Sequence, residues 1–120
     1  MQRLINAGAS VNVIDESGTT PLHWAAFGGH QRVVKELIAE GALVNVPDKD
    51  SFSPLDTAAQ KGFAKIVQLL IKAGANLEAR DRDGGTALYA AAGKGHIRIV
   101  RLLLKAGKLQ KPSDYRGIGV

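Results

Sequence analysis

A fixed period of 33 residues is the feature that most constrains how this chain can fold. Aspartate recurs at this step, at Asp15, Asp48, Asp81 and Asp114. The same step relates three further sets: Leu22, Leu55 and Leu88; Ala25, Ala58 and Ala91; and Gly29, Gly62 and Gly95. Several residue types sharing one register indicate a stack of repeated units, in which each unit buries its apolar side only against its neighbours.

Each unit carries the signals of two short helices. Thr20-Pro21 and Ser53-Pro54 pair a hydroxyl N-cap with proline at the first helical position, where its missing N–H costs nothing. The glycine at 29, 62 or 95 is expected to end this first helix. The second helix should bury one apolar stripe per unit: Val33, Val34, Leu37 and Ile38; Ile66, Val67, Leu70 and Ile71; and Ile99, Val100, Leu103 and Leu104. Gly41, Gly74 and Gly107 are expected to end these second helices.

Turn signals join one unit to the next. DESG at 15–18, DRDG at 81–84 and DYRG at 114–117 predict tight turns, and DKDS at 48–51 is the odd member because Ser51 stands where glycine recurs. We expect Ser51 to cost about 1 kcal/mol if its backbone is left-handed.

The segments TPLHWAAFGGH (20–30) and LIAEGALVN (37–45), repeated at this step, resemble the ankyrin repeat family. The resemblance implies an all-α solenoid of stacked antiparallel helix pairs with hairpin-like loops. It divides residues 1–120, taken as one domain, into a partial repeat (1–14), complete repeats (15–47, 48–80 and 81–113) and a partial repeat or tail (114–120).

The histidines look like an active-site fragment, but the repeat argues for a structural role. His23 aligns with Asp56 and Tyr89, so no metal ligand recurs at that position. The resemblance implies that His23 hydrogen-bonds near the helix start and steadies the next loop. His30 and His96, two periods apart, are too distant to share one metal.

Other chemistry finds no support in the pattern. No nucleophile, base and orienting group converge, so we predict no catalytic site, no metal site, no cofactor and no enzyme activity. Trp24, between core positions of the first helix, is expected to fill the core.

The composition limits location and partners. The chain has no cysteine, which removes disulfides and thiol chemistry and suits a reducing compartment. No apolar run approaches the ~20 residues that cross a bilayer, and the N-terminus does not read as a signal peptide. We therefore expect an intracellular protein, in cytoplasm or nucleus, and a monomer.

The net charge of +5 is unevenly distributed. Residues 1–60 carry four basic and seven acidic residues, whereas 61–120 carry twelve basic and four acidic ones. Basic residues recur opposite the apolar stripe, at Arg32, Lys65 and Arg98, at Lys35 and Arg101, and at Lys72 and Lys105. They predict a basic band on the outer face, which is either a solvated surface or a site for an anionic partner.

The main prediction is protein binding without catalysis, with a protein partner and without nucleic acid or membrane. In the family, loop tips and the exposed side of the first helix grip partners. The matching positions are Glu16, Ser17, Thr19 and Phe27; Lys49, Asp50, Phe52, Gln60 and Lys61; and Arg82, Asp83, Gly85, Gly93 and Lys94. These positions vary between units on a constant frame, which favours recognition.

Phe27 and Phe52 are the predicted anchors, and alanine at either is expected to weaken binding by more than about 1 kcal/mol. For both, partial burial between units is the competing interpretation. Two other hypotheses stay open: binding of nucleic acid or acidic lipid by the outer basic band, and an engineered or truncated array without a dedicated partner. Asn12 and Asn45 match a loop asparagine that can be hydroxylated in animal relatives, although hydrogen bonding in the loop is the simpler interpretation.

Overall fold

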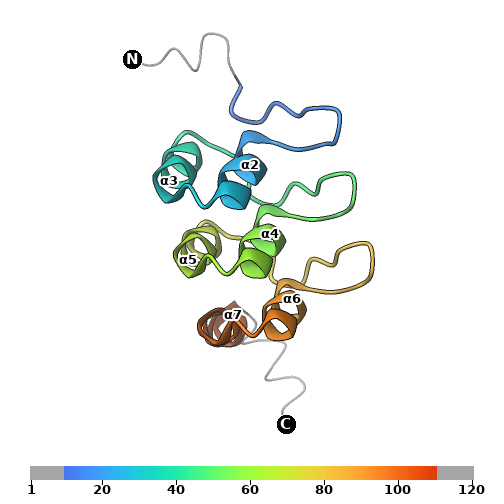
Figure 1. Ribbon diagram of the computed structural model, residues 1–120. Helices are drawn as coiled ribbons and strands as arrows, with labels where there is room; N and C mark the ends of the chain where they lie inside the picture. Colours follow the sequence, from blue (N-terminus) through green and yellow to red (C-terminus); the bar gives the residue numbers. More distant parts are fainter. Residues whose placement is uncertain (1–9, 111–120) are drawn as a thin grey trace.

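The protein is a stack of antiparallel helix pairs with loops projecting to one side (Figure 1). The computed structural model describes residues 10–110. Within this range the helices are α2 (Pro21–Gly28), α3 (Gln31–Ala39), α4 (Pro54–Lys61), α5 (Ala64–Lys72), α6 (Ala87–Lys94) and α7 (Ile97–Gln110). The described residues form no β-strand. The predicted all-α solenoid is therefore confirmed.

The first helices begin as the hydroxyl–proline signal predicts. The Thr20 hydroxyl accepts a hydrogen bond from the His23 backbone N–H, and the His23 side chain in turn accepts from the Thr20 N–H. Ser53 and Asp56 form the same reciprocal pair at the start of α4. Such capping boxes satisfy N–H groups that have no partner inside the helix.

The glycines that end α2 and α4 meet two demands at once. Gly29 and Gly62 have φ angles of 73° and 85°, in the left-handed region. Each also lies under a ring of the next unit. A Cβ on Gly29 would lie 2.9 Å from Phe63, and one on Gly62 would lie 2.7 Å from His96. Glycine at these positions therefore permits both the turn and the close stacking of units.

The core runs continuously through the stack between first and second helices. Leu22, Leu55, Val34 and Leu70 are at most 1% exposed, and the alanine pairs of α2 and α4 are almost fully buried beside them. Small side chains at these positions let neighbouring first helices approach closely. Val33 and Leu104, predicted to lie in the buried stripe, are instead 49% and 50% exposed. Ile66 and Ile99, the equivalents of Val33, are buried on helices that contact the second helix of the preceding unit. Among residues 10–110, α3 is the first of the second helices and α7 the last, so Val33 and Leu104 each lack a neighbouring second helix on one side.

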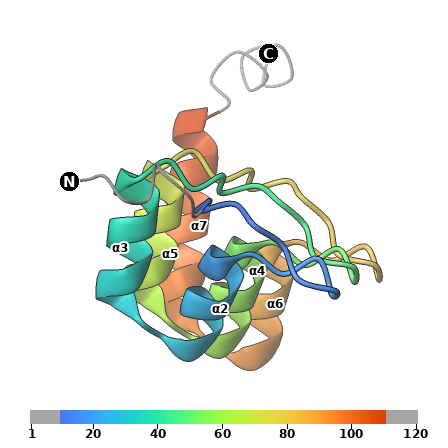
Figure 2. The ribbon, with the colours of Figure 1, turned by 90° about the horizontal axis from the view of Figure 1, so that it is seen from above.

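Each loop folds back on itself like a hairpin before the next first helix. The N–H of Asp15, Asp48 and Asp81 donates to the carbonyl four residues later, at 2.8–3.1 Å. Seen from above, α2, α4 and α6 lie between the outer helices and the loops (Figure 2). The first helices and the loops therefore meet at an angle, and the surface that they form together is called the inner surface. The second helices α3, α5 and α7 form the opposite, outer face.

Asparagines connect successive units at the end of the second helices. The Asn12 side chain donates to the Gly41 carbonyl and accepts from the Leu43 N–H at 2.8 Å. Asn45 makes the same pair of bonds to Gly74 and Asn76. The expected hydrogen bonding is present, but it reaches the next unit rather than staying within its own loop.

The prediction that Gly107 ends the last helix is wrong, because α7 continues to Gln110. Gly41 and Gly74 both have a φ of 95° and turn the chain, and each is held by an asparagine from the preceding unit. The residue in register for the third turn is Glu78, whose carboxyl side chain has no N–H to donate to a turn carbonyl. The amide donor that holds the first two turns therefore has no counterpart in the third unit.

Three further predictions fall outside the described residues. These are the partial repeat before Ser10, the DYRG turn at 114–117 and the tail to Val120.

Candidate partner-binding surface

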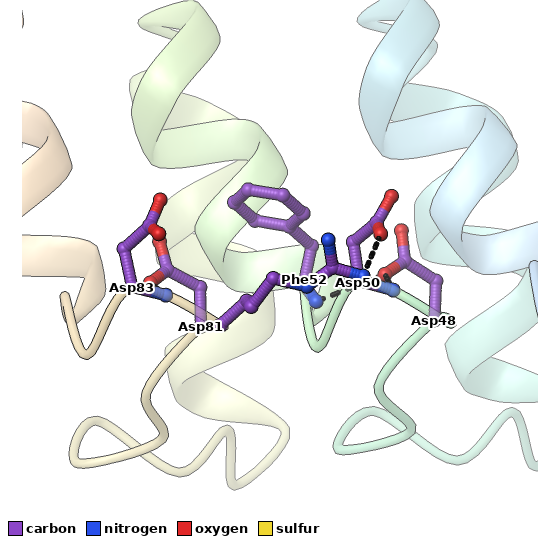
Figure 3. A network of polar contacts seen from close by, with 6 residues as sticks. Asp48, Asp50, Phe52, Asp81 and Asp83 are labelled. Carbon is purple, nitrogen blue, oxygen red and sulfur yellow. Dashed lines mark hydrogen bonds and ion pairs between the residues drawn. The ribbon is translucent and has the colours of Figure 1, made fainter.

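The loop tips are closed by aspartates that bond to their own backbone. Asp48 Oδ1 accepts from the N–H groups of Asp50 and Phe52, at 2.8 and 3.0 Å (Figure 3). Asp15 and Asp81 do the same in the other two loops. In the first loop these bonds, led by that from the Thr19 N–H, lower the pKa of Asp15 below 3.8. The repeated aspartate therefore fixes the shape of each tip.

Neighbouring tips are tied to one another. The Lys49 N–H donates to the Ser17 carbonyl at 2.9 Å, joining the first loop to the second. Arg82 forms an ion pair of 2.8 Å with Asp50, joining the second loop to the third (Figure 3). Both side chains are more than half exposed, so this pair contributes little stability. It orders the charged groups along the edge of the inner surface.

His23 braces one unit against the next. Its Nδ1 accepts from the Thr20 N–H at 3.0 Å, and its Nε2 lies 3.0 Å from the Phe52 carbonyl. With Nδ1 as acceptor, Nε2 carries the proton and donates. The side chain is 3% exposed. The structural role predicted for this histidine is confirmed.

Asp56, the equivalent of His23 in the second unit, keeps only the capping half of this role. Burial raises the pKa of Asp56 above 3.8, partly opposed by its hydrogen bonds from Ser53 and reinforced by the nearby Asp81 and Asp48. As an acceptor it cannot donate to a carbonyl of the following loop when ionised.

Trp24 and Phe27 form an exposed aromatic pair on the inner surface. Their rings meet edge to face, with centroids 6.3 Å apart, and they are 58% and 51% exposed. Trp24 Nε1 donates to Asp15 Oδ2 at 3.3 Å, and Lys61 Nζ lies 4.4 Å from the centre of the Phe27 ring. The prediction that Trp24 fills the core is wrong, because Leu22, Ala25 and Ala26 already occupy the buried side of this short helix.

A hollow of about 190 Å³ opens beside this pair, between α2, α4 and the second loop. Trp24, Phe27 and His23 line it from α2, and Thr57 and Asp48 line the other side. It combines aromatic walls with a carboxylate, which suits one side chain of a partner rather than a whole ligand, since ligand pockets usually measure about 300–1,000 Å³.

Comparison with known families agrees with this architecture. A model described as "Ankyrin repeats (3 copies)" matches residues 1–81, and one described as "Ankyrin repeats (many copies)" matches residues 65–104. The chain belongs to the ankyrin repeat family. No curated protein sequence matches it.

Ankyrin repeats are generally modules for protein–protein interaction, and the family is typically non-catalytic. In residues 10–110, no three His, Asp or Glu side chains gather as a metal site would require. None of the described helices is long and apolar enough to cross a membrane.

The predicted contact residues of this ankyrin array fall into two groups according to their exposure to solvent. The exposed ones are Glu16, Ser17, Phe27, Lys49, Asp50, Gln60, Lys61, Arg82, Asp83, Gly93 and Lys94. The remaining three, Thr19, Phe52 and Gly85, are partly buried. Two of the set also brace the stack through their carbonyls: Phe52 accepts from His23, and Gln60 lies 3.1 Å from His96 Nε2.

Two aromatic residues on the first helices of the ankyrin units were missed from the sequence. Trp24 was assigned to the core, and Tyr89, 77% exposed on α6, was treated only as an equivalent of His23. The spacing of three between Trp24 and Phe27 was an available signal. It places both on the side of the helix opposite Leu22 and Ala26.

Proposed function

We propose that this ankyrin array binds a partner protein through its inner surface, with Trp24 and Phe27 as the anchoring side chains. The observation that carries the proposal is the exposed aromatic pair beside a hollow, between loop tips that are tied together. Large aromatic side chains supply much of the energy at interfaces when a partner covers them. A stack braced by His23 and the asparagines can bind with little change of shape.

Exposed charged residues on the loop tips and first helices support selection of a partner. Lys61 lies over the Phe27 ring, and Lys49, Asp50, Asp83 and Glu16 are exposed on the loops, so the proposed surface presents both signs. Mixed rims favour orientation of a matching partner more than raw affinity. Phe52 has a smaller place in the proposal, because its side chain is partly buried and its carbonyl supports His23.

A capture experiment with matched variants tests the proposal. Wild-type protein, the Trp24→Ala/Phe27→Ala double variant and Ile97→Ala are immobilised and exposed to the same native extract, and bound proteins are quantified by mass spectrometry. Ile97 is 62% exposed on α7, away from the loops, and so controls for the loss of apolar surface.

A true partner should be depleted on the double variant and retained on Ile97→Ala. Calorimetry with that purified partner should then show each single alanine variant weakening binding by more than about 1 kcal/mol. Circular dichroism checks that the variants remain folded. The Phe27 change removes an exposed cation–π contact with Lys61, worth about 0.5–1 kcal/mol, and the edge-to-face contact with Trp24. Partners recovered equally on all three proteins would refute the assignment of the anchors.

A further inference from the structure

A second surface lies on the outer face of the stack, away from the loops. A groove of about 410 Å³ runs over α5 and is bordered by α3 and α7. Four lysines line it: Lys35 from α3, Lys65 and Lys72 from α5, and Lys105 from α7. All four are exposed. The groove is therefore positively charged on every helix that forms it.

The helices beneath the groove supply no compensating charge. Neither α5 (AKIVQLLIK) nor α7 (IRIVRLLLKAGKLQ) contains an aspartate or glutamate, and no carboxylate lines the groove. The ion pair found among residues 10–110, between Arg82 and Asp50, is on the loop tips. Glu36, the one acidic residue of the bordering helix α3, is not among the residues that line the groove. The four clustered cations therefore create a field in the groove that attracts a negatively charged partner.

The floor of the groove is apolar. Leu69 and Ile71 from α5 and Leu102 and Ala106 from α7 line it and are less exposed than the lysines. The uncharged polar residues Gln31 and Gln68 complete the lining. Leu69, Ile71 and Leu102 remain partly exposed to solvent although they pack against the core. A ligand that only neutralised the lysines would leave this apolar surface uncovered.

We propose that this groove binds an acidic amphipathic helix of a partner protein, whose aliphatic side chains cover the floor while its carboxylates meet the lysines. The arrangement fits the helix-in-groove mode of recognition, with apolar anchors three and four residues apart. It does not rest on the inner-surface proposal, because the two surfaces lie on opposite sides of the first helices.

The same observations disfavour other polyanions. The groove has no aromatic side chain on which bases could stack, and a phosphate backbone has no aliphatic groups for Leu69 and Leu102. A bilayer surface would meet the lysines first, because the apolar residues that line the groove are less exposed than the lysines.

A fluorescein-labelled peptide of leucine and glutamate provides the probe, with leucines spaced for one helical face. About 16 residues make a helix ~24 Å long, enough to cross three helices packed 8–10 Å apart. The control peptide is an isomer of the same composition with the leucines dispersed around the helix. A glutamate-only peptide, a single-stranded oligonucleotide and vesicles of phosphatidylcholine and phosphatidylserine complete the set.

Binding is measured by fluorescence anisotropy, and for vesicles by co-sedimentation. The amphipathic peptide should bind at least about tenfold more tightly than its isomer and than each of the other anions. Lys72→Glu/Lys105→Glu should weaken it by at least about tenfold, whereas Arg98→Glu/Arg101→Glu should change it by less than about threefold. The second pair makes the same charge change at exposed residues of α7 outside the groove.

Equal loss in the two double variants would overturn the proposal, since binding would then follow net charge alone. Equal or tighter binding of the isomer, the oligonucleotide or the vesicles would also overturn it, as would no binding of the amphipathic peptide. In a ¹⁵N-labelled sample, the peptide should shift the amide signals of Leu69, Lys72 and Leu102 and leave those of Trp24 and Phe27 unchanged. Shifts confined to the inner surface would contradict the outer site without bearing on the inner proposal.

Discussion

Ser51 lies in a backbone conformation that the rest of the repeat assigns to glycine. Its φ is 67°, and it is the non-glycine residue with positive φ among residues 10–110. The equivalent glycines, Gly18 and Gly84, have φ angles of 74° and 83°. In all three loops the N–H at this position donates to the aspartate carbonyl three residues earlier, at 2.9 Å. The turn is therefore the same, and Ser51 adopts it at a cost.

Ser51→Gly should stabilise the protein by ~0.5–1 kcal/mol. A left-handed conformation costs an L-residue about 1–2 kcal/mol, and the greater freedom of glycine in the unfolded chain offsets ~0.4–1 kcal/mol of that relief. Within residues 10–110 the Ser51 hydroxyl makes no hydrogen bond that would be lost. The expected rise in the melting temperature is roughly 2–6 °C for a domain of this size.

Thermal and urea unfolding followed by circular dichroism measure this change, and two matched variants show its origin. Ser51→Ala removes the hydroxyl but keeps the Cβ, so its stability should equal that of the wild type. Gly84→Ser introduces the same strain where the space around the new Cβ is open, and it should cost about 1 kcal/mol. If Ser51→Ala stabilised as much as Ser51→Gly, or Gly84→Ser were neutral, backbone strain would not be the cause.

Two further changes probe the buried capping residues of the first helices. His23→Ala should lower the free energy of unfolding, measured in urea, by about 2–4 kcal/mol, because it leaves a buried cap N–H and the Phe52 carbonyl without partners and opens a cavity. Tyr89→Ala, at the exposed equivalent position, should change the free energy of unfolding by no more than ~0.5 kcal/mol. Because burial raises the pKa of Asp56 above 3.8, its ionisation is harder in the folded protein, so its contribution is fully present below pH 3.8 and is lost as pH rises through the raised value. The stability of Asp56→Asn relative to the wild type should therefore increase across that window, and a pH-independent difference would contradict the burial argument.

The helix pairs could be predicted because their signals are local and repeated. Thr20-Pro21 and Ser53-Pro54 start helices through atoms within the same turn, and Gly29 and Gly62 end them through backbone conformations that glycine adopts freely. A 33-residue register then repeats each signal, so an ambiguity in one unit is resolved by the others.

The third turn could not be predicted from its own residues. Gly107 has the residue type of Gly41 and Gly74, yet α7 passes through it. The first two turns each accept a hydrogen bond from an asparagine of the preceding unit, Asn12 or Asn45. Glu78, which is 29 residues before Gly107, stands in place of that asparagine in the third unit. This relation between residues of different units can be recognised only once the stacking of the units is known.

The candidate binding surface also combines features that the sequence predicts with features that only the folded structure shows. The sequence alone determined the frame and the variable, charged character of the loop tips, because both follow from local patterns compared across the repeats. The role of His23 was implied by the resemblance to the ankyrin repeat family. Only the tertiary structure decided that Trp24 lies outside the core beside Phe27, and that lysines of three helices surround one apolar groove. Those surfaces exist because stacking brings together side chains from different units, and which side of a short helix is buried depends on what packs against it.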